Sequence, residues 1–297
     1  MNRFQVEDSS VPALPPRPLD GHKGSFGTVV VVGGSAGEPM MLGGPCLAGR
    51  AAFRAGCGRV VLTLPQRLLP TALGVLPEAT GLVLEGAPAN VIKIQPNAVA
   101  IGPGLGCDGD TDALVELISQ DASVPRVIDA DALGAMARKG IDGLRGPVVI
   151  TPHPGEWMTL ARALGVKGNP IEREERPAAA HALAARLDQG GGEVVVVLKG
   201  AETIVSNGIR CWRCGVKEPL LAVGGSGDVL TGIVASLLAQ FHPRPGEEAR
   251  SDRIGAFELA CTATAMHAAA GTRLAARMGH AGLLASELAD ELPYVRT

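Results

Sequence analysis

Short apolar runs that end in glycine or in a polar residue recur along this chain, and they constrain its fold more than any other feature. The clearest are residues 29–32 and 194–198, which carry no polar side chain. Strands of this kind are typical of the middle of a parallel sheet, where both faces are buried. Further strands are predicted at residues 59–64, 97–101, 126–133 and 147–150.

Segments with a helical spacing of small and apolar residues alternate with these strands. They are predicted at residues 43–56, 110–119, 154–164, 178–187, 228–240, 254–278 and 283–292. The alternation indicates the α/β class, with a mostly parallel central sheet covered by helices on both faces (αβα). Asn207-Gly208 lies between two short strand-like segments and predicts one β-hairpin near residues 203–213.

The length of 297 residues is compatible with one large α/β domain or two smaller ones. We expect a single domain over residues 21–297, because no internal repeat or low-complexity segment is evident. Residues 1–20 are rich in proline, which removes backbone donors and disfavours helix and central strand alike. They are predicted to form an extended N-terminal arm that lies against the domain.

Charge and apolar patterning exclude several classes of partner. Twenty-seven basic and thirty acidic residues give a net charge of −3, and no basic block occurs, so nucleic acid is not an expected partner. The apolar runs are too short to span a membrane, and residues 1–20 lack the apolar core of a signal peptide. We therefore expect a cytoplasmic protein without a membrane partner. The six scattered cysteines indicate reduced thiols.

The stretch from Val223 to Gly232 combines small residues, one carboxylate and the start of an apolar helix. Glycines let the backbone approach a ligand, and a helix N-terminus offers free N–H groups and a positive dipole end to an anion. Asp228 is placed in the first turn, where it can face the bound group. The alternative interpretation is that Asp228 only caps the helix.

Other strand ends bring residue types that suit a phosphorylated ligand. Gly33-Gly34-Ser35 and residues 102–106 offer backbone N–H groups, Lys199 offers a cation and Thr203 a hydroxyl. Taken alone, Lys199-Gly200 is more often a strand-to-turn exit than a ligand site. No Walker motif is present, and no GxGxxG follows the first strand.

Four more polar residues at strand ends are open to two interpretations. Asp129 and Asp131 either cap the next helix or hold a metal. His153 is either a ligand contact or an exposed turn residue. Glu156 either faces solvent or orients a magnesium ion through water.

Gly225-Ser226-Gly227-Asp228 ahead of an apolar helix resembles the anion-hole and base motif of the ribokinase-like superfamily. The finer resemblance is to the ADP/ATP-dependent NAD(P)H-hydrate dehydratases, in a standalone form without the epimerase domain. It runs from about Gly21 to the C-terminus. The motifs that carry it, in the family's order, are Lys23-Gly24, Gly33-Gly34-Ser35, Gly43-Gly44 with Leu47-Ala48, 101–106, 129–133, 151–156, 199–203 and 224–232.

The resemblance implies a role for each matching position. Asp228 is implied as the catalytic base. The residues implied to contact the hydrated dinucleotide are Gly44, Gly104, Gly106, His153 and Asp228. Those implied to contact the adenine nucleotide are Lys199, Gly200, Ala201, Glu202, Thr203, Gly224, Gly225, Ser226 and Gly227. The family usually has alanine at the position of Gly44, and it commonly has Asn-Pro-Gly-Met-Ala-Thr where this chain has residues 218–223.

The implied activity is the dehydration of the S-epimer of hydrated NADH or NADPH, with ADP or ATP as co-substrate and Mg²⁺ as cofactor. The resemblance also implies a homo-oligomer, a tetramer as in relatives of the family, and a separate epimerase as partner. Two alternatives remain at this stage. A ribokinase-like kinase of a vitamin or sugar alcohol would share Asp228 and yield a stable phosphorylated product, and a nucleotide-binding sensor would bind ADP without turnover.

Overall fold

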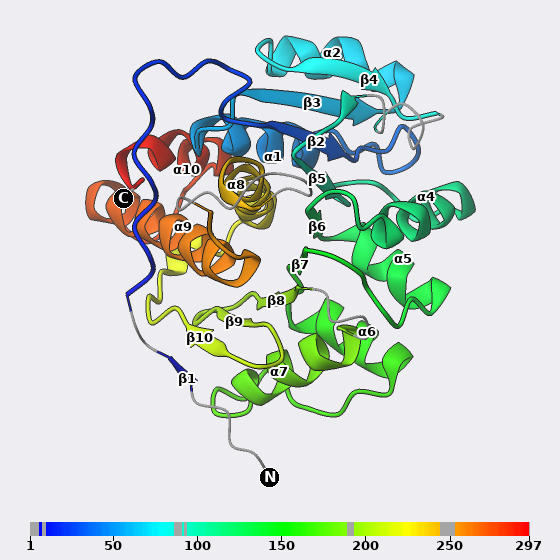
Figure 1. The fold of residues 1–297 in the computed structure, drawn as a ribbon, viewed down its shortest axis with the longest axis vertical. Helices are drawn as coiled ribbons and strands as arrows, with labels where there is room; N and C mark the ends of the chain where they lie inside the picture. The colour runs from blue at the N-terminus through cyan, green and yellow to red at the C-terminus, as the bar shows by residue number, and fades with distance from the viewer. Residues whose placement is uncertain are drawn as a thin grey trace.

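The computed structural model describes residues 6–7, 10–85, 91, 94–188, 193–243 and 253–296. Within these residues ten strands form one sheet in the order β1-β10-β9-β8-β7-β6-β5-β2-β3-β4 (Figure 1). The strands are β1 (Val6–Glu7), β2 (Thr28–Val32), β3 (Arg59–Leu64), β4 (Thr80–Val83), β5 (Ala98–Ile101), β6 (Arg126–Ile128), β7 (Val148–Ile150), β8 (Val194–Leu198), β9 (Ile204–Ser206) and β10 (Cys211–Arg213).

The sheet is parallel from β4 through β8, and β9 alone runs antiparallel to both of its neighbours. The β9–β10 pair is the hairpin predicted from Asn207-Gly208. In its turn Gly208 takes a φ of +77°, which a residue with a side chain rarely adopts. β1 then pairs in parallel with β10 at the edge of the sheet.

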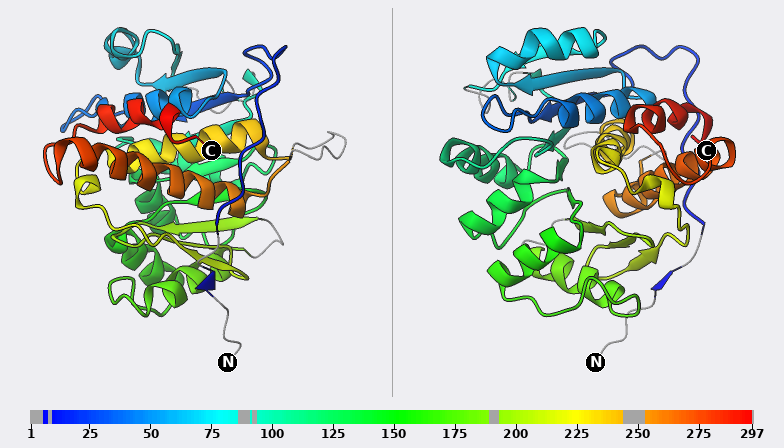
Figure 2. Two further views of the ribbon diagram at one scale, coloured as in Figure 1. Left: turned by 90° about the vertical axis from the view of Figure 1, so that its left-hand side faces the viewer. Right: turned by 180° about the vertical axis from the view of Figure 1, so that it is seen from behind.

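Helices cover both faces of the sheet, which confirms the α/β prediction (Figures 1 and 2). Helices α1, α8, α9 and α10 pack on one face with the short α2, and helices α4, α5, α6 and α7 pack on the other. The helices are α1 (Gly43–Arg54), α2 (Leu69–Val75), α4 (Gly109–Gln120), α5 (Asp131–Lys139), α6 (Pro154–Leu164), α7 (Arg176–Leu187), α8 (Ser226–Phe241), α9 (Ala256–Met278) and α10 (Ala285–Glu291).

The central strands are apolar throughout because each of their faces meets a layer of helices. In β7, Val149 packs into the core formed with α8 and α9, while Val148 and Ile150 pack into the core formed with α5 to α7. All three side chains are fully buried. This two-sided burial is the physical reason that the apolar runs predicted the middle of the sheet.

Several elements differ from the sequence prediction, and three of the differences bear on the site or on the edge of the sheet. The strand predicted at 126–133 ends at Ile128, and Asp131 already begins α5. α8 begins at Ser226, two residues before the predicted start, because Gly225 forms the cap in the left-handed region. The segment 69–83, for which no element was predicted, forms α2 and β4 at the far edge of the sheet.

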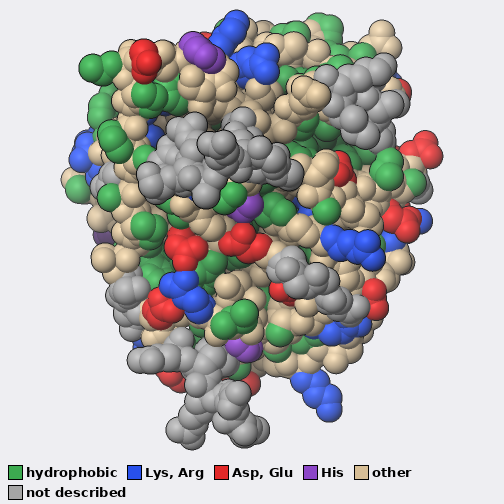
Figure 3. Space-filling model, viewed as in Figure 1, with side chains coloured by type: hydrophobic (Ala, Val, Ile, Leu, Met, Phe, Trp, Pro, Cys, Tyr) green, Lys and Arg blue, Asp and Glu red, His purple; other side chains and the backbone are tan. Residues whose placement is uncertain are grey.

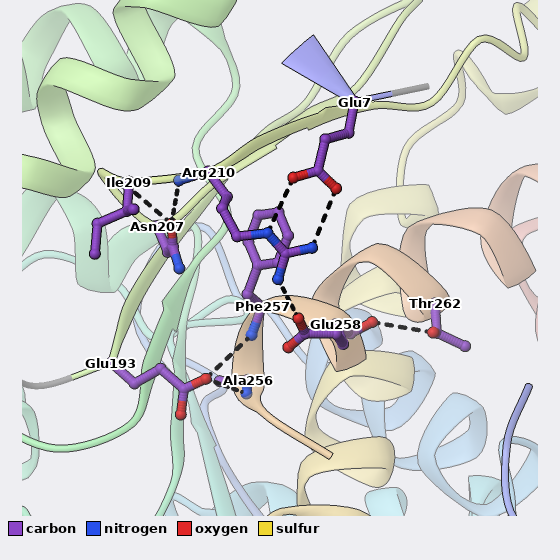
Figure 4. Close-up of polar contacts among 9 residues, drawn as sticks. All are labelled: Glu7, Glu193, Asn207, Ile209, Arg210, Ala256, Phe257, Glu258 and Thr262. Atoms are coloured by element: carbon purple, nitrogen blue, oxygen red, sulfur yellow. Dashed lines mark hydrogen bonds and ion pairs between the residues drawn. The ribbon is translucent and has the colours of Figure 1, made fainter. Parts of the chain in front are cut away.

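The described part of the N-terminal arm contacts the domain at several points, and besides the β1–β10 pairing three of them involve side chains of Glu7, Leu14 and Arg17. Glu7 of β1 accepts hydrogen bonds from the Arg210 guanidinium at 3.0 and 3.1 Å, and Arg210 also pairs with Glu258 (Figure 4). Leu14 is buried in the core. Arg17 stacks on the Phe26 ring at 3.5 Å. We propose that residues 1–20 form an arm that fastens to a domain comprising residues 21–297.

On the face seen in Figure 3, lysine and arginine side chains are interspersed with acidic and apolar ones. In the described part of the chain, no helix combines the length and apolar character needed to cross a membrane.

Candidate active site

The first turn of α8 has the geometry of an anion site. Gly225 caps the helix with a φ of +90°, and a Cβ there would lie 2.6 Å from Leu47 Cδ1. The Ser226 N–H donates to Val223 O at 3.3 Å and the Val229 N–H to Gly225 O at 3.1 Å. The N–H groups of Gly227 and Asp228 lie between them, in the first turn, where a helix offers its donors no internal acceptor. These two groups are therefore available to a phosphate.

Asp228 is half-buried in this first turn and is not the helix cap, since Gly225 occupies that position. Burial and the nearby Asp129 carboxylate raise the pKa of Asp228 to about 7, although Lys199 acts in the opposite direction. A carboxyl group with a pKa near neutrality is matched to general-base chemistry at physiological pH. The structure thus excludes the capping alternative for Asp228, and its role as a base stays a prediction.

Gly44 lies next to Asp228, and the glycine turn that follows β5 lies next to Gly44. A Cβ on Gly44 would stand 3.1 Å from Asp228 Oδ1 and 3.2 Å from Pro103 Cβ. Gly104 and Gly106 have φ values of +60° and +85°, which favour glycine. The structure therefore places Gly44 beside the carboxylate and the turn that contains Gly104 and Gly106 beside Gly44. All three glycines are predicted to contact the dinucleotide.

Asp129 and Asp131 do not cap α5, whose cap is Ala130, and among the residues that the structure describes they belong to no metal-binding cluster. Asp129 is 1% exposed and accepts a hydrogen bond from the Thr231 hydroxyl at 2.6 Å. Asp131 accepts the Gly106 N–H at 2.9 Å and so holds the glycine turn. Ala130 between them has a φ of +48°, which is rare for a residue with a side chain and is typical of backbone strain at functional sites.

Lys199 is placed by an ion pair inside the site. Its ammonium lies 2.7 Å from Asp129 Oδ1 and 3.7 Å from Glu156 Oε2. Burial opposes the charge on both Lys199 and Asp129, yet their attraction prevails, so the pKa of Lys199 is raised and that of Asp129 is lowered. A Cβ on Gly227 would be 3.5 Å from Lys199 Nζ, which places the ammonium beside the start of α8.

His153 and Glu156 form a reciprocal capping box at the start of α6. The Glu156 carboxylate accepts the His153 N–H at 2.7 Å, and His153 Nδ1 accepts the Glu156 N–H at 3.2 Å. The His153 side chain is 56% exposed and lies at the rim of the pocket described next. Both residues are thus held at the carboxyl edge of the sheet, as predicted. Interpreting His153 as an exposed turn residue accounts for its exposure but not for its capping hydrogen bond or its place in the pocket lining.

A pocket of about 750 Å³ opens on the other side of the α8 start. The loop after β8, the segment 214–223, the first turn of α8 and the middle of α9 form its walls, which are mostly apolar. The lining residues are His153, Pro154, Lys199, Gly200, Ala201, Thr203, Cys214, Val216, Lys217, Glu218, Pro219, Leu221, Ala222, Val223, Ser226, Gly227, Leu230, Thr264, His267 and Ala268. Its size and apolar lining suit an adenine nucleotide.

Comparison with known proteins agrees with this geometry. A family model described as NAD(P)H-hydrate dehydratase matches residues 29–294. The chain belongs to this family.

Two relatives show how the match is distributed. The ADP-dependent (S)-NAD(P)H-hydrate dehydratase of Bacillus subtilis is 32% identical over 98% of this chain and 97% of its own length. The bifunctional NAD(P)H-hydrate repair enzyme of Moorella thermoacetica is 36% identical over 95% of this chain, which spans only 51% of that protein.

Solved structures give the same result. The ADP/ATP-dependent NAD(P)H-hydrate dehydratase of Bacillus subtilis, co-crystallised with ATP/Mg²⁺, superposes with a TM-score of 0.76 at 31% identity, covering 95% of this chain and 93% of that one. Ribokinase from Cryptococcus neoformans superposes with a TM-score of 0.59 at 14% identity, covering 90% and 98%, and this likeness concerns the fold alone. The fold is therefore ribokinase-like.

Six of the nine residues that the dehydratase resemblance assigned to the adenine nucleotide line the pocket, but Glu202, Gly224 and Gly225 do not. Glu202 points elsewhere. Its carboxylate turns away to the Arg173 guanidinium and lies 3.6 Å from Lys217 Nζ. These partners lower the pKa of Glu202 to about 2, with the Arg173 hydrogen bond contributing most. Gly224 and Gly225 form the turn that leads into α8. A Cβ on Gly224 would meet no atom within 4 Å, so that position has room for a side chain.

His267 is a site residue that the sequence analysis missed. It projects from α9, and its Nε2 lies 3.0 Å from Ser226 O and 3.1 Å from Ser226 Oγ. Burial lowers the pKa of His267 to about 4, so the ring is neutral and Nε2–H donates to the serine oxygens. His267 therefore supports the first turn of α8. Its segment has no glycine or polar signature, so only tertiary structure reveals its role.

The carboxylates here fit a magnesium ion that is bound mainly by other ligands. Among the described residues, no group of three or more His, Cys, Asp or Glu could hold a metal. Burial raises the pKa of Glu156, Lys199 opposes this shift and Asp129 adds to it. A nearby cation would favour the ionised form of Glu156. Magnesium on nucleotide phosphates keeps several waters and needs only one or two protein carboxylates. Glu156 would be the carboxylate that holds such an ion through water.

Proposed function

We propose that this protein dehydrates the S-epimer of hydrated NADH or NADPH and restores the reduced dinucleotide, consuming ADP or ATP. The observation that carries the proposal is the position of Asp228. Its carboxylate lies next to Gly44, and the preceding residues of its helix, Ser226 and Gly227, line the nucleotide-sized pocket. One base between two such sites can activate a hydroxyl of the first ligand toward a phosphoryl group of the second.

The proposed reaction has two steps. Asp228 accepts the proton of the ring hydroxyl while the hydroxyl oxygen attacks the terminal phosphorus, which breaks the bond to the bridging oxygen and releases AMP from ADP, or ADP from ATP. The C–O bond then breaks with loss of phosphate and of a proton from the neighbouring ring carbon, and the double bond is restored. Phosphate leaves far more readily than hydroxide.

In this reaction the residues of the chain stabilise the charge on the transferring phosphoryl group and hold it in position. The Gly227 and Asp228 N–H groups face the transferring phosphoryl oxygens, and Lys199 adds positive charge beside them. Bound Mg²⁺ would neutralise charge on the phosphates. Cytoplasmic location, a tetrameric assembly and a separate epimerase partner stay predictions; the bifunctional repair relative supports the last of these.

The expected result of a direct assay is recovery of the reduced-nicotinamide absorbance from hydrated NADH. Recovery should require the hydrate, the nucleotide and magnesium together, because the hydroxyl is a poor leaving group until it is phosphorylated. ADP and ATP are compared side by side, with a mixture lacking nucleotide as the control. Absence of recovery with both nucleotides would overturn the proposal.

The pH dependence of this reaction is expected to follow Asp228. The raised pKa, about 7, means that the carboxyl retains its proton at pH values where an ordinary aspartate has lost it. Only the ionised form is a base, so kcat/KM should fall about tenfold for each pH unit below about pH 7. The profile is measured at saturating nucleotide. A rate that stays level from about pH 5 to pH 7 would contradict this role.

A further inference from the structure

Arg176, the first residue of α7, lies beneath the loop that lines the nucleotide pocket although it belongs to none of the motifs of that pocket. It is 7% exposed. Its Nη2 lies 3.0 Å from Leu198 O, 3.1 Å from Lys199 O and 3.3 Å from Glu202 O. Its Nη1 donates to Pro170 O. One guanidinium thus contacts the carbonyls at both ends of the loop 199–203.

Gly200 and Arg176 are matched to each other. A Cβ on Gly200 would stand 2.5 Å from Nη2 and 2.9 Å from Cζ of the guanidinium. Gly200 does not have a left-handed φ, so the close approach of the side chain, and not backbone conformation, accounts for the glycine here. Lys199-Gly200 was open to two interpretations from sequence, a strand exit or a ligand site. In the structure the missing side chain of Gly200 leaves the space that the guanidinium occupies.

The carbonyls that Arg176 holds orient the pocket-facing groups of the loop. Lys199, Gly200, Ala201 and Thr203 line the pocket, while the carbonyls of Lys199 and Glu202 contact the arginine. Removal of the guanidinium would leave buried carbonyls without donors, which is costly, and the loop would move to reach water. Arg173 holds the same loop from outside, through the Glu202 side chain, and its own side chain is 58% exposed.

We propose that Arg176 is the positioning residue that sets the loop 199–203 in the shape that binds the adenine nucleotide. This inference rests on the proposed function in one respect: it takes the pocket of about 750 Å³ as the nucleotide site. It concerns nucleotide affinity and not the chemical step, because Arg176 contacts neither Asp228 nor the anion turn of α8 in the described structure.

The test measures ADP binding to the full chain by calorimetry, together with KM and kcat, for Arg176→Met and Arg176→Lys. Arg176→Met is expected to weaken ADP binding at least about tenfold, which corresponds to the loss of one or two buried hydrogen bonds. At saturating nucleotide, kcat should stay within about threefold. The ADP affinity of Arg176→Lys should fall between those of the native chain and Arg176→Met, because an ammonium cannot span the same carbonyls. Arg186→Met, whose guanidinium on the same helix contacts Asp142, is the matched control with unchanged ADP affinity.

Gly200→Ala provides a second test in a chain that keeps Arg176. Its methyl displaces the guanidinium, so it should weaken ADP binding as Arg176→Met does. Unchanged ADP affinity in Arg176→Met or Gly200→Ala, or a loss of kcat without a loss of affinity, would overturn the inference. If Arg176→Met does not fold, Gly200→Ala decides. Because ADP binding is measured without the hydrate, failure of the dehydratase proposal and failure of this inference are distinguishable.

Discussion

Asp228→Asn is expected to lower kcat by at least about 10²-fold, the range for loss of a general base. The amide keeps the shape of the carboxylate in the first turn of α8 but cannot accept the hydroxyl proton. ADP affinity should change little, because no phosphate-facing N–H group is removed. The measurements are kcat at saturating hydrate and nucleotide, and ADP binding by calorimetry.

Thermal unfolding of the same variant supplies the control. Asp228 is held near other carboxylates, and burial disfavours its charge, so the neutral amide should not lower the melting temperature. The variant should also lose the fall in activity below about pH 7. Retention of most turnover together with a lower melting temperature would show that Asp228 is structural.

Lys199→Met is expected to lower the free energy of unfolding by about 3–5 kcal/mol, as for removal of one partner of a buried ion pair. Asp129 is 1% exposed, and without the ammonium its charge would lose its cationic partner and keep hydroxyl donors such as Thr231. The same change should also weaken nucleotide binding, because the cation beside Gly227 is lost. Urea unfolding measures the first effect and calorimetry with ADP measures the second.

Two further variants separate the ion pair from general effects. Asp129→Asn with Lys199→Met removes both charges, so it should recover much of the lost stability. Lys139→Met removes an exposed lysine paired with Glu116 and should leave stability nearly unchanged. Equal stability of Lys199→Met and the native chain would contradict the assigned role of Lys199 in the site.

The sheet and its order of elements were predictable because their signals are local. Wholly apolar runs such as Val194–Leu198 report burial on both faces, and Asn207-Gly208 reports a turn whose backbone suits only a few residue types. The convergence of polar strand ends was also predictable, because the carboxyl ends of parallel strands share one edge of the sheet. The motifs at those ends carried the family resemblance that the comparisons confirmed.

The pairing of side chains was not predictable, because it depends on residues far apart in sequence. Lys199 meets Asp129 from 70 positions away, and Glu202 turns toward Arg173 instead of the pocket. His267 reaches Ser226 from a helix whose sequence reads only as apolar packing. The short strand β4 and helix α2 lie at the sheet edge, where partial exposure weakens the apolar pattern.

The most direct test of the central claim is the fate of the phosphoryl group when hydrated NADH reacts with ADP. Phosphorus NMR of the reaction, with absorbance read in parallel, measures inorganic phosphate, AMP and reduced dinucleotide together. A dehydratase with Asp228 as its base should release one phosphate and one AMP for each NADH restored, without an accumulating phosphoester. A stable phosphorylated product, formed without recovery of NADH, would show instead that the site is that of a kinase.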